Sequence, residues 1–441
     1  MFSRSAGFFV PLIALWTLGA LLACSAAAAA QERVSLTLML RGGTPEREAF
    51  ALQTIEAFEA RYPHINVEWE IAGSGWQDQI VVRHASGVAP DVTEMFATFS
   101  QDWAEAGLLL DLRPYIERDL AGGELADFFP PIWNSGTLYH GPLRGIFYGV
   151  PRYVNLIGAY AYNVDLVEAA GLERVEDVDR RGQWTWQALR EYTRKLTIRA
   201  SDDQVRQWGL GAPLSARWKG WVHSNGGKVF NYPDDPFDFM LDRPEALEAL
   251  EFFQSLVWDD KVVINDGGPA FERGDVAFSA AGVELFAGRF PAVIGDAFRW
   301  DIAPRAMGAA GRGVYTAKDQ YGIIASTKHP DEAWELVKFL VSEEGQRLMM
   351  RTAGLMPIRI SLMPEYLEML GDKNAHHLAT AVQEAIPDPM AVLVESQRTG
   401  PLIDGAIRRS VITNEVPAAV AIQEIAPVIR SIMAEAKARE E

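Results

Sequence analysis

Two tryptophans stand close together in a polar stretch of this 441-residue chain. Trp218 and Trp221 belong to RWKGWVHSNGG, in which arginine, lysine, histidine and asparagine surround them. An exposed indole can cover the flat face of a small molecule while polar neighbours bond its rim. The structural alternative is a pair of core residues, because most tryptophans are highly buried. The polar setting favours a ligand platform, and Trp218 more than Trp221, because both rings cannot easily face one ligand.

The signatures of common enzyme chemistries are missing. AGSGW only looks like a nucleophile elbow, no HExxH motif occurs, and His376 and His377 are adjacent, so they cannot share a helix face toward a metal. No Walker loop is present, and no GxGxxG segment follows a strand. The sequence therefore predicts a protein that is not an enzyme and needs no cofactor. Its many Asp and Glu residues still leave a pair of catalytic carboxylates open.

The first thirty residues have the pattern of an export signal. Arg4 precedes an apolar segment, and a run of small residues follows. Two endings compete: LLAC resembles a lipobox that would place a lipid on Cys24, and the alternative is cleavage after Ala30. Cys24 is the only cysteine, so the exported body has no disulfide. We expect the protein to work outside the cytoplasm, in the periplasm or at the cell surface.

The charge of the chain excludes some partners. It carries 41 Lys and Arg against 59 Asp and Glu, a formal net charge of −18. Nucleic acids and anionic membrane surfaces both require clustered basic residues, so neither is an expected partner. The length suggests two or three structural units at roughly 150 residues per domain.

The elements that must position the candidate side chains alternate along the first third of the chain. Strand patterns at 34–40, 65–70 and 90–95 enclose helix patterns that begin at Pro45 and Trp76. Such alternation predicts a parallel sheet with crossover helices. Further along, 156–163 is expected to form one aromatic-rich strand, and about the last seventy residues to be helical. No disordered linker separates these parts, which favours a chain that crosses between lobes more than once.

Several segments, in order and spacing, resemble the extracellular solute-binding proteins of carbohydrate ABC importers, of which the maltose-binding type is the familiar example. The resemblance runs from about Val34 to Ala436, and the segments that carry it include FEARYPHINVEWE, ASGVAPDVTEM, WAEAGLLLDLRPYI, FERGDVAFSAAG and AGLMPIR. Each segment alone is weakly specific, whereas their order along the chain is strongly specific. An export signal with a possible lipid anchor agrees with it.

The resemblance implies an α/β fold of two lobes, the periplasmic-binding-protein or Venus flytrap fold, with three inter-lobe crossovers. The crossovers are expected near 152–155, 315–320 and 387–393. After a signal at 1–30, residues 31–152 and 319–388 would form the N-terminal lobe, and residues 153–318 and 389–441 the C-terminal lobe. Ligand would bind between the lobes, beyond the carboxyl ends of strands, and the lobes would close by hinge motion.

The function implied is capture of a mono-, di- or short oligosaccharide and its delivery to the transmembrane subunits of an ABC permease, by a protein expected to be monomeric. A pyranose has an apolar face rimmed by hydroxyls, so its sites combine aromatic rings with Asp, Glu, Asn and Arg. Maltodextrin-binding relatives bring an aromatic residue from the C-terminal region into the cleft. This chain has none after Tyr366, which disfavours a long oligosaccharide.

Candidate ligand contacts follow from these positions in the resemblance. They are the residues after the first and third strands, the first crossover, the tryptophan stretch and the segments GVELF and FRW. The candidates are Gly43, Trp76, Glu94, Phe96, Arg152, Tyr153, Trp218, Trp221, Glu284, Phe286 and Arg299.

Other functions remain open at the level of sequence. A binding protein of the same fold could take a polyamine on carboxylates and aromatics, a glycerol phosphate on arginines and helix N-termini, or a metal on tyrosines. The same fold could serve a membrane receptor as a ligand sensor. A secreted glycoside hydrolase is the alternative from a different class.

Overall fold

The computed structural model describes residues 33–440 apart from 42–44, 74, 121, 139–140, 142, 202–203, 267 and 318. The predicted export segment, the lipidation candidate Cys24 and the site candidate Gly43 lie outside the described residues. Within the described ranges, no helix combines the length and the apolar character needed to cross a membrane.

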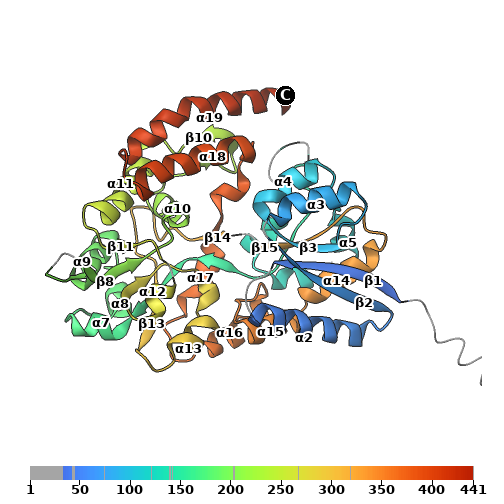
Figure 1. The fold of residues 1–441 in the computed structure, drawn as a ribbon, viewed down its shortest axis with the longest axis horizontal. Coiled ribbons are helices and arrows are strands. Elements are labelled where there is room, and N and C mark those ends of the chain that lie inside the picture. Colours follow the sequence, from blue (N-terminus) through green and yellow to red (C-terminus); the bar gives the residue numbers. More distant parts are fainter. Residues whose placement is uncertain are drawn as a thin grey trace, which may run out of the picture.

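The first lobe is built around a five-stranded sheet with the order β2-β1-β3-β15-β4. β1 pairs in parallel with β2 and β3, while β15 is antiparallel to β3 and β4. In Figure 1, α3 and α4 lie on one side of this sheet and α2 and α15 on the other. This arrangement confirms the predicted crossover helices and buries β3 on both faces. The elements are β1 (Val34–Arg41), α2 (Pro45–Arg61), β2 (Ile65–Ala72), α3 (Trp76–Ala85), β3 (Val92–Phe96), α4 (Ala97–Glu105), α5 (Arg113–Asp119), α6 (Pro130–Trp133), β4 (Val150–Pro151), β15 (Asp319–Ile323), α14 (Pro330–Leu340), α15 (Glu343–Ala353), α16 (Met363–Met369) and α17 (His377–Glu384).

The second lobe contains a sheet with the order β11-β8-β12-β6-β13, and β7 pairs with β8. The C-terminal helix α19 packs on α11 and β10, and α18 packs on α19 (Figure 1). These helices confirm the helical C-terminal segment. The elements are β6 (Ala159–Asn163), α7 (Val164–Ala169), α8 (Val175–Arg180), α9 (Trp186–Leu196), β7 (Ile198–Arg199), β8 (Val205–Gly211), α10 (Leu214–Ser224), β9 (Phe230–Asn231), β10 (Asp235–Phe239), α11 (Pro244–Trp258), β11 (Val263–Ile264), α12 (Pro269–Glu272), β12 (Val276–Ser279), α13 (Arg289–Ile294), β13 (Trp300–Pro304), α18 (Ser396–Ile407) and α19 (Ala418–Glu440).

Three short strands join the lobes. β5 (Asn155–Ile157), β14 (Tyr315–Ala317) and β16 (Ile386–Pro387) form a separate three-stranded sheet. β14 is the central strand, antiparallel to β5 and parallel to β16. The three predicted crossovers therefore lie side by side in one hydrogen-bonded unit.

The expected single strand at 156–163 is wrong, because the structure divides this segment at Gly158. β5 pairs with β14 in the crossover sheet, whereas β6 pairs with β12 and β13 in the second lobe. A side chain at Gly158 would place its Cβ 2.9 Å from Cγ1 of Val314. Glycine thus allows the chain to pass close to the second crossover as it changes sheet.

Candidate functional site

Glu94, near the end of β3, joins two arginines from different parts of the chain. Its Oε1 lies 2.8 Å from Nη2 of Arg152, which follows β4, and the two side chains are 3% and 1% exposed. Its Oε2 accepts a 3.0 Å hydrogen bond from the backbone N–H of Arg41, at the end of β1. Because β1 and β3 are parallel neighbours, their carboxyl ends meet at one edge of the sheet. The predicted residues Glu94 and Arg152 are therefore close together, and they are paired with each other.

Asp319, the first residue of β15, completes this cluster. One of its oxygens accepts hydrogen bonds from the hydroxyl of Tyr153 at 2.7 Å and from Nδ2 of Asn155 at 3.1 Å. Its other oxygen pairs with the guanidinium of Arg41. Tyr153 and Asn155 belong to the first crossover, and Asp319 follows the second. The cluster thus fixes two crossovers to the strand ends of the first lobe.

Burial and neighbouring charges together set the charge states in this cluster. Burial by itself lowers the pKa of Arg152, but the interactions with Glu94, Tyr321, Asp319 and Tyr153 together outweigh it and raise that pKa above its ordinary value, so the guanidinium stays charged. Burial, reinforced by the charge of Asp319, raises the pKa of Tyr153, so its hydroxyl remains a donor. With Arg41, the cluster holds two cations and two carboxylates and is balanced in charge.

Phe96, the last residue of β3, supplies an aromatic ring beside the cluster. The ring is half-buried, and the guanidinium carbon of Arg41 lies 3.8 Å from its centre. A cation over a ring at this distance is attracted to the ring face. Arg41 therefore covers one face of the predicted aromatic contact and is itself bonded to Glu94 and Asp319.

Glu284 lies close enough to this cluster for the charge of Asp319 to shift its pKa. It follows β12, and its Oε2 is buried without a hydrogen-bond partner among the described residues. Burial raises its pKa, the charge of Arg217 works in the opposite direction, and the charge of Asp319 raises the pKa further. Glu284 therefore keeps one buried carboxyl oxygen available beside the crossovers, within the part of the chain that the structure describes.

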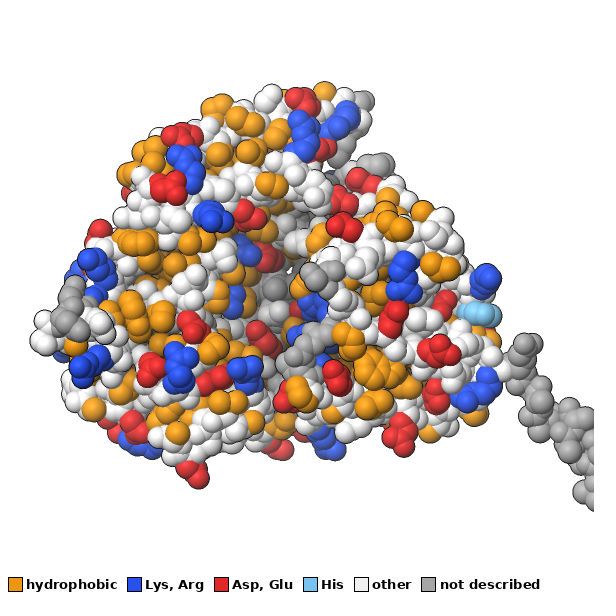
Figure 2. Space-filling model, in the orientation of Figure 1, with side chains coloured by type: hydrophobic (Ala, Val, Ile, Leu, Met, Phe, Trp, Pro, Cys, Tyr) orange, Lys and Arg blue, Asp and Glu red, His pale blue; other side chains and the backbone are white. Residues whose placement is uncertain are grey.

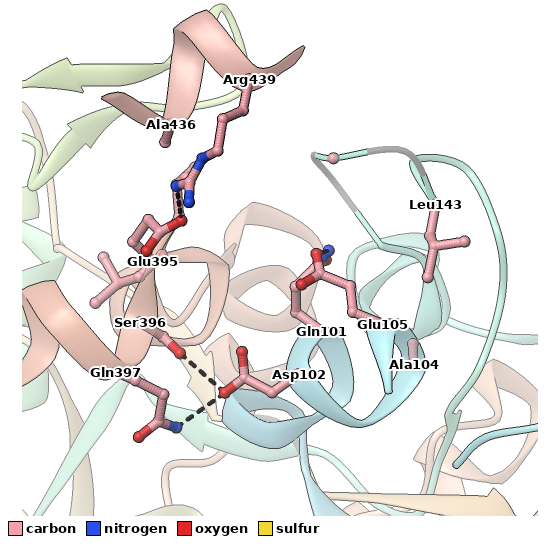
Figure 3. A pocket seen from close by; sticks show the side chains of 13 residues that line it. Gln101, Asp102, Ala104, Glu105, Leu143, Glu395, Ser396, Gln397, Ala436 and Arg439 are labelled. Carbon is pink, nitrogen blue, oxygen red and sulfur yellow. Dashed lines mark hydrogen bonds and ion pairs between the residues drawn. The ribbon is translucent and has the colours of Figure 1, made fainter. Parts of the chain in front are cut away.

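A cavity of about 630 Å³ lies between the lobes. Figure 3 shows α4 of the first lobe facing the start of α18 and the end of α19. Asp102 on α4 accepts hydrogen bonds from Nε2 of Gln397 at 2.9 Å and from the hydroxyl of Ser396 at 3.4 Å. On the other side of the cavity, Arg439 pairs with Glu395. The described lining mixes polar and apolar side chains, and both lobes contribute to it.

A second cavity of about 310 Å³ adjoins the first, because Leu393, Ser396 and Gln397 line both. Phe99 comes from the first lobe, and Trp218 and Lys219 come from α10 of the second. Figure 2 shows the hollow between the lobes, with basic and acidic side chains inside it. Within the described ranges, no group of three or more His, Cys, Asp and Glu side chains is placed to hold a metal ion.

The expectation that the two tryptophans present open faces is wrong. Trp221 is 2% exposed and stacks on Phe253 with the ring centres 5.5 Å apart. Trp218 is 1% exposed, and its Nε1 donates to the backbone oxygen of Ser215 at 3.1 Å. Both lie on α10, whose inner face packs on the core of the second lobe. Trp218 still forms part of a cavity wall, whereas Trp221 belongs to the core.

Two other aromatic candidates are also core residues. Phe286 is fully buried and packs against Phe290 and Trp300, with ring centres 6.0 and 6.2 Å away. Trp76 begins α3 as expected but is buried, with its ring centre 5.8 Å from that of Trp103. Both fill the space beneath a helix, so neither offers a face to a ligand.

Arg299 does not reach the cleft. Its side chain is 64% exposed and bonds Asp165 and Glu168 on α7, each at 2.6 Å. Arg299 directly precedes β13, whose first residue, Trp300, pairs with Asn163 at the end of β6. This end of β6 is the one farther from the crossovers. Its surroundings therefore correct the expectation of a cleft contact.

Three polar residues that the structure brings to this region, Arg41, Asp319 and Asp102, are not among the contacts predicted from the sequence. Arg41 follows the first predicted strand and Asp319 lies within the second predicted crossover, and these positions are the available signal. Asp102 stood inside a helix pattern, where nothing distinguished it from a solvated residue.

Comparisons with known proteins agree on one family. The model of the family described as bacterial extracellular solute-binding protein matches residues 42–347. An uncharacterized lipoprotein in the oleD 5′ region of Streptomyces antibioticus is 27% identical over 334 residues, 72% of this chain and 69% of the relative.

Two solved structures show the same fold. An ABC substrate-binding protein from Listeria monocytogenes in complex with cycloalternan has a TM-score of 0.74 at 19% identity, covering 91% of this chain and all of that one. UgpB from Mycobacterium tuberculosis in complex with glycerophosphocholine has a TM-score of 0.73 at 17% identity, covering 92% and 99% of the two chains.

Proposed function

Because the chain belongs to the bacterial extracellular solute-binding protein family, we propose that it captures a mono-, di- or short oligosaccharide between its lobes and delivers it to an ABC permease. The segments 31–152 and 319–388 then act as one lobe and 153–318 and 389–441 as the other. The three crossover strands are the hinge between them.

The observation that carries this proposal is the composition of the inter-lobe space. Its described lining from both lobes includes amides, hydroxyls and paired charges together with the aromatic residues Phe99 and Trp218. Sugar hydroxyls both donate and accept hydrogen bonds, so they suit a lining that contains both kinds of group. The combined cavities fall within the range of small-molecule sites, roughly 300–1,000 Å³.

A glycerol phosphodiester is the second candidate, and the structural similarity to the glycerophosphocholine complex of UgpB supports it. Charge disfavours it. The arginines of the cluster are occupied by Glu94 and Asp319, and Arg439 by Glu395. A phosphate would have to displace one of these carboxylates or bind beside it. A neutral, hydroxyl-rich ligand requires no such exchange.

Within this proposal, Phe96, Arg41 and Glu284 are the ligand contacts of the cluster, with Gly43 beside them in sequence. Trp218 serves as a wall rather than a stacking platform. The lack of an aromatic residue after Tyr366 favours a short saccharide.

The remaining parts of the proposal concern the setting of the protein. The chain acts by binding and carries out no catalysis, as expected for a family of solute-binding proteins. It works outside the cytoplasm as a monomer, and a lipid on Cys24 holds it at the membrane. The similarity to an uncharacterized lipoprotein supports that anchor.

The experiment is a thermal-shift screen of the purified protein with three ligand classes: neutral mono-, di- and trisaccharides, glycerol phosphodiesters, and polyamines. A ligand at about 100 times its Kd adds about 2.7 kcal/mol to the free energy of unfolding. A rise in Tm confined to saccharides, without their consumption, supports the proposal. A rise confined to phosphodiesters or polyamines overturns the substrate class, and consumption of a saccharide overturns the transport function.

A further inference from the structure

A separate cavity of about 280 Å³ lies beside the third crossover. Its described walls come from α10, from the segment that leads through the β9–β10 hairpin, and from β16 with the residues around it. They are Lys219, Val222, His223, Gly227, Lys228, Val229, Phe230, Tyr232, Pro233, Ala385, Ile386, Pro387, Pro389 and Val392. Only Lys219 also lines either of the two inter-lobe cavities among the described residues, so this is a different site.

The walls are mostly apolar and partly flat. Two aromatic residues, Phe230 and Tyr232, and three prolines line the cavity together with valine and isoleucine side chains. Rings and prolines bury apolar area with little loss of side-chain entropy. Such walls favour an apolar ligand, and a flat one more than a flexible chain.

The charged side chains at this cavity are all basic. No Asp or Glu is among its described lining residues, although the chain carries a net charge of −18. Lys219 is neutralised, because its Nζ lies 2.6 Å from Oδ2 of Asp388. The positive charge of Lys228 is only weakly compensated. Its Nζ donates to the amide oxygen of Asn231 at 3.0 Å, and Oδ2 of Asp234 is 3.9 Å away.

His223 adds a polar group that carries no charge near neutral pH. Burial lowers its pKa, and the nearby charge of Lys228 lowers it further. A neutral imidazole can donate one hydrogen bond and accept another. The cavity therefore offers one cation with spare donors, one neutral imidazole and apolar walls.

We propose that this cavity binds a small aromatic carboxylate, with the ring between the apolar walls and the carboxylate on Lys228. A carboxylate on an ammonium is a charge-assisted pair, stronger than a neutral hydrogen bond. A polar solute such as a sugar would leave the apolar walls unmatched. The site is independent of the solute proposed for the inter-lobe space, and it contacts β16, one of the three strands that join the lobes.

The test is calorimetric titration of the purified protein with 1-naphthoate and with its neutral counterpart 1-naphthamide. Three variants accompany the wild type. Lys228→Met removes the charge and keeps the apolar stem. Lys195→Met makes the same change at an exposed lysine on α9, away from the cavity. Ile386→Trp fills the cavity at a half-buried position.

We expect 1-naphthoate to bind the wild type at least about tenfold more tightly than 1-naphthamide, the size of effect expected for one charge-assisted hydrogen bond. Lys228→Met abolishes that preference, Lys195→Met leaves it unchanged, and Ile386→Trp weakens both compounds. Failure of 1-naphthoate to bind would overturn the proposal. So would equal binding of the two compounds, or a preference that survives in Lys228→Met. Because Lys228 is partly exposed, its variant remains informative even if Ile386→Trp does not fold.

Discussion

Replacing Glu94 by glutamine tests how much the buried cluster at the crossovers stabilises the protein. Each oxygen of Glu94 accepts from a different donor, Nη2 of Arg152 and the backbone N–H of Arg41. Glutamine keeps the size of the side chain but has one acceptor oxygen and one N–H₂ group. One of the two donors therefore loses its acceptor, and Arg152 loses its only carboxylate partner at hydrogen-bond distance among the described residues.

The expected cost follows from burial rather than from distance. The Glu94–Arg152 pair spans 2.8 Å with side chains 3% and 1% exposed. The Glu70–Arg83 pair is similarly short, at 2.6 Å, but its side chains are 38% and 29% exposed. Removing one partner of a buried pair costs about 3–5 kcal/mol, whereas an exposed pair contributes about 0–1 kcal/mol. Because glutamine retains one hydrogen bond, we expect Glu94→Gln to cost about 3 kcal/mol.

Urea unfolding of the wild type, Glu94→Gln and the control Glu70→Gln measures this difference through the midpoint and the slope. The expected result is a clearly lower midpoint for Glu94→Gln and a midpoint near the wild type for Glu70→Gln. Equal midpoints for the two variants would refute the reasoning, because the same substitution would then cost the same in buried and exposed surroundings.

Three further substitutions test the site. Glu284 has a raised pKa in the folded protein, so its ionisation above about pH 4 destabilises the fold. Glu284→Gln should therefore raise the free energy of unfolding at pH 7 and have no effect on it below about pH 4. Urea unfolding at the two pH values tests this, and the same difference from the wild type at both would contradict it. Trp221→Ala should cost about 3–5 kcal/mol, as expected for a core tryptophan; a normal Tm with lost ligand binding would restore its role as a platform. Asp102→Ala removes the inter-lobe hydrogen bonds to Ser396 and Gln397. Ligand affinity measured by calorimetry should therefore fall about fivefold, equivalent to about 1 kcal/mol. Unchanged affinity would show that these hydrogen bonds do not favour closure of the lobes.

The sequence predicts those features that rest on local patterns. The strands at 34–40 and 65–70, the helix that begins at Trp76 and the three crossovers all occur in the structure. Hydrophobic periodicity and glycine positions determine such elements, so a single chain reveals them. Glu94, Arg152 and Tyr153, predicted as ligand contacts, lie together in the structure because strand ends and crossovers converge on one edge of a sheet. Their contact with a ligand stays a prediction.

Features that depend on tertiary packing cannot be predicted from local sequence patterns. Trp218 and Trp221 stand among polar residues along the chain, but α10 turns both rings toward the core of the second lobe. The segment at 156–163 is strand-like throughout in composition, yet its first part pairs in the crossover sheet and its second part in the sheet of the second lobe. Arg299 finds two carboxylates on α7, and nothing in its own neighbourhood predicts that pairing.

The central claim is that a saccharide binds between the two lobes. The most direct measurement is a crystal structure of the protein with the saccharide that gives the largest thermal shift. We expect density for the sugar between α4 and the start of α18, with contacts to Phe96 or Arg41 from one lobe and to residues of α10 or α18 from the other. Sugar density confined to the outer surface of one lobe, with the inter-lobe space free of it, would contradict the account.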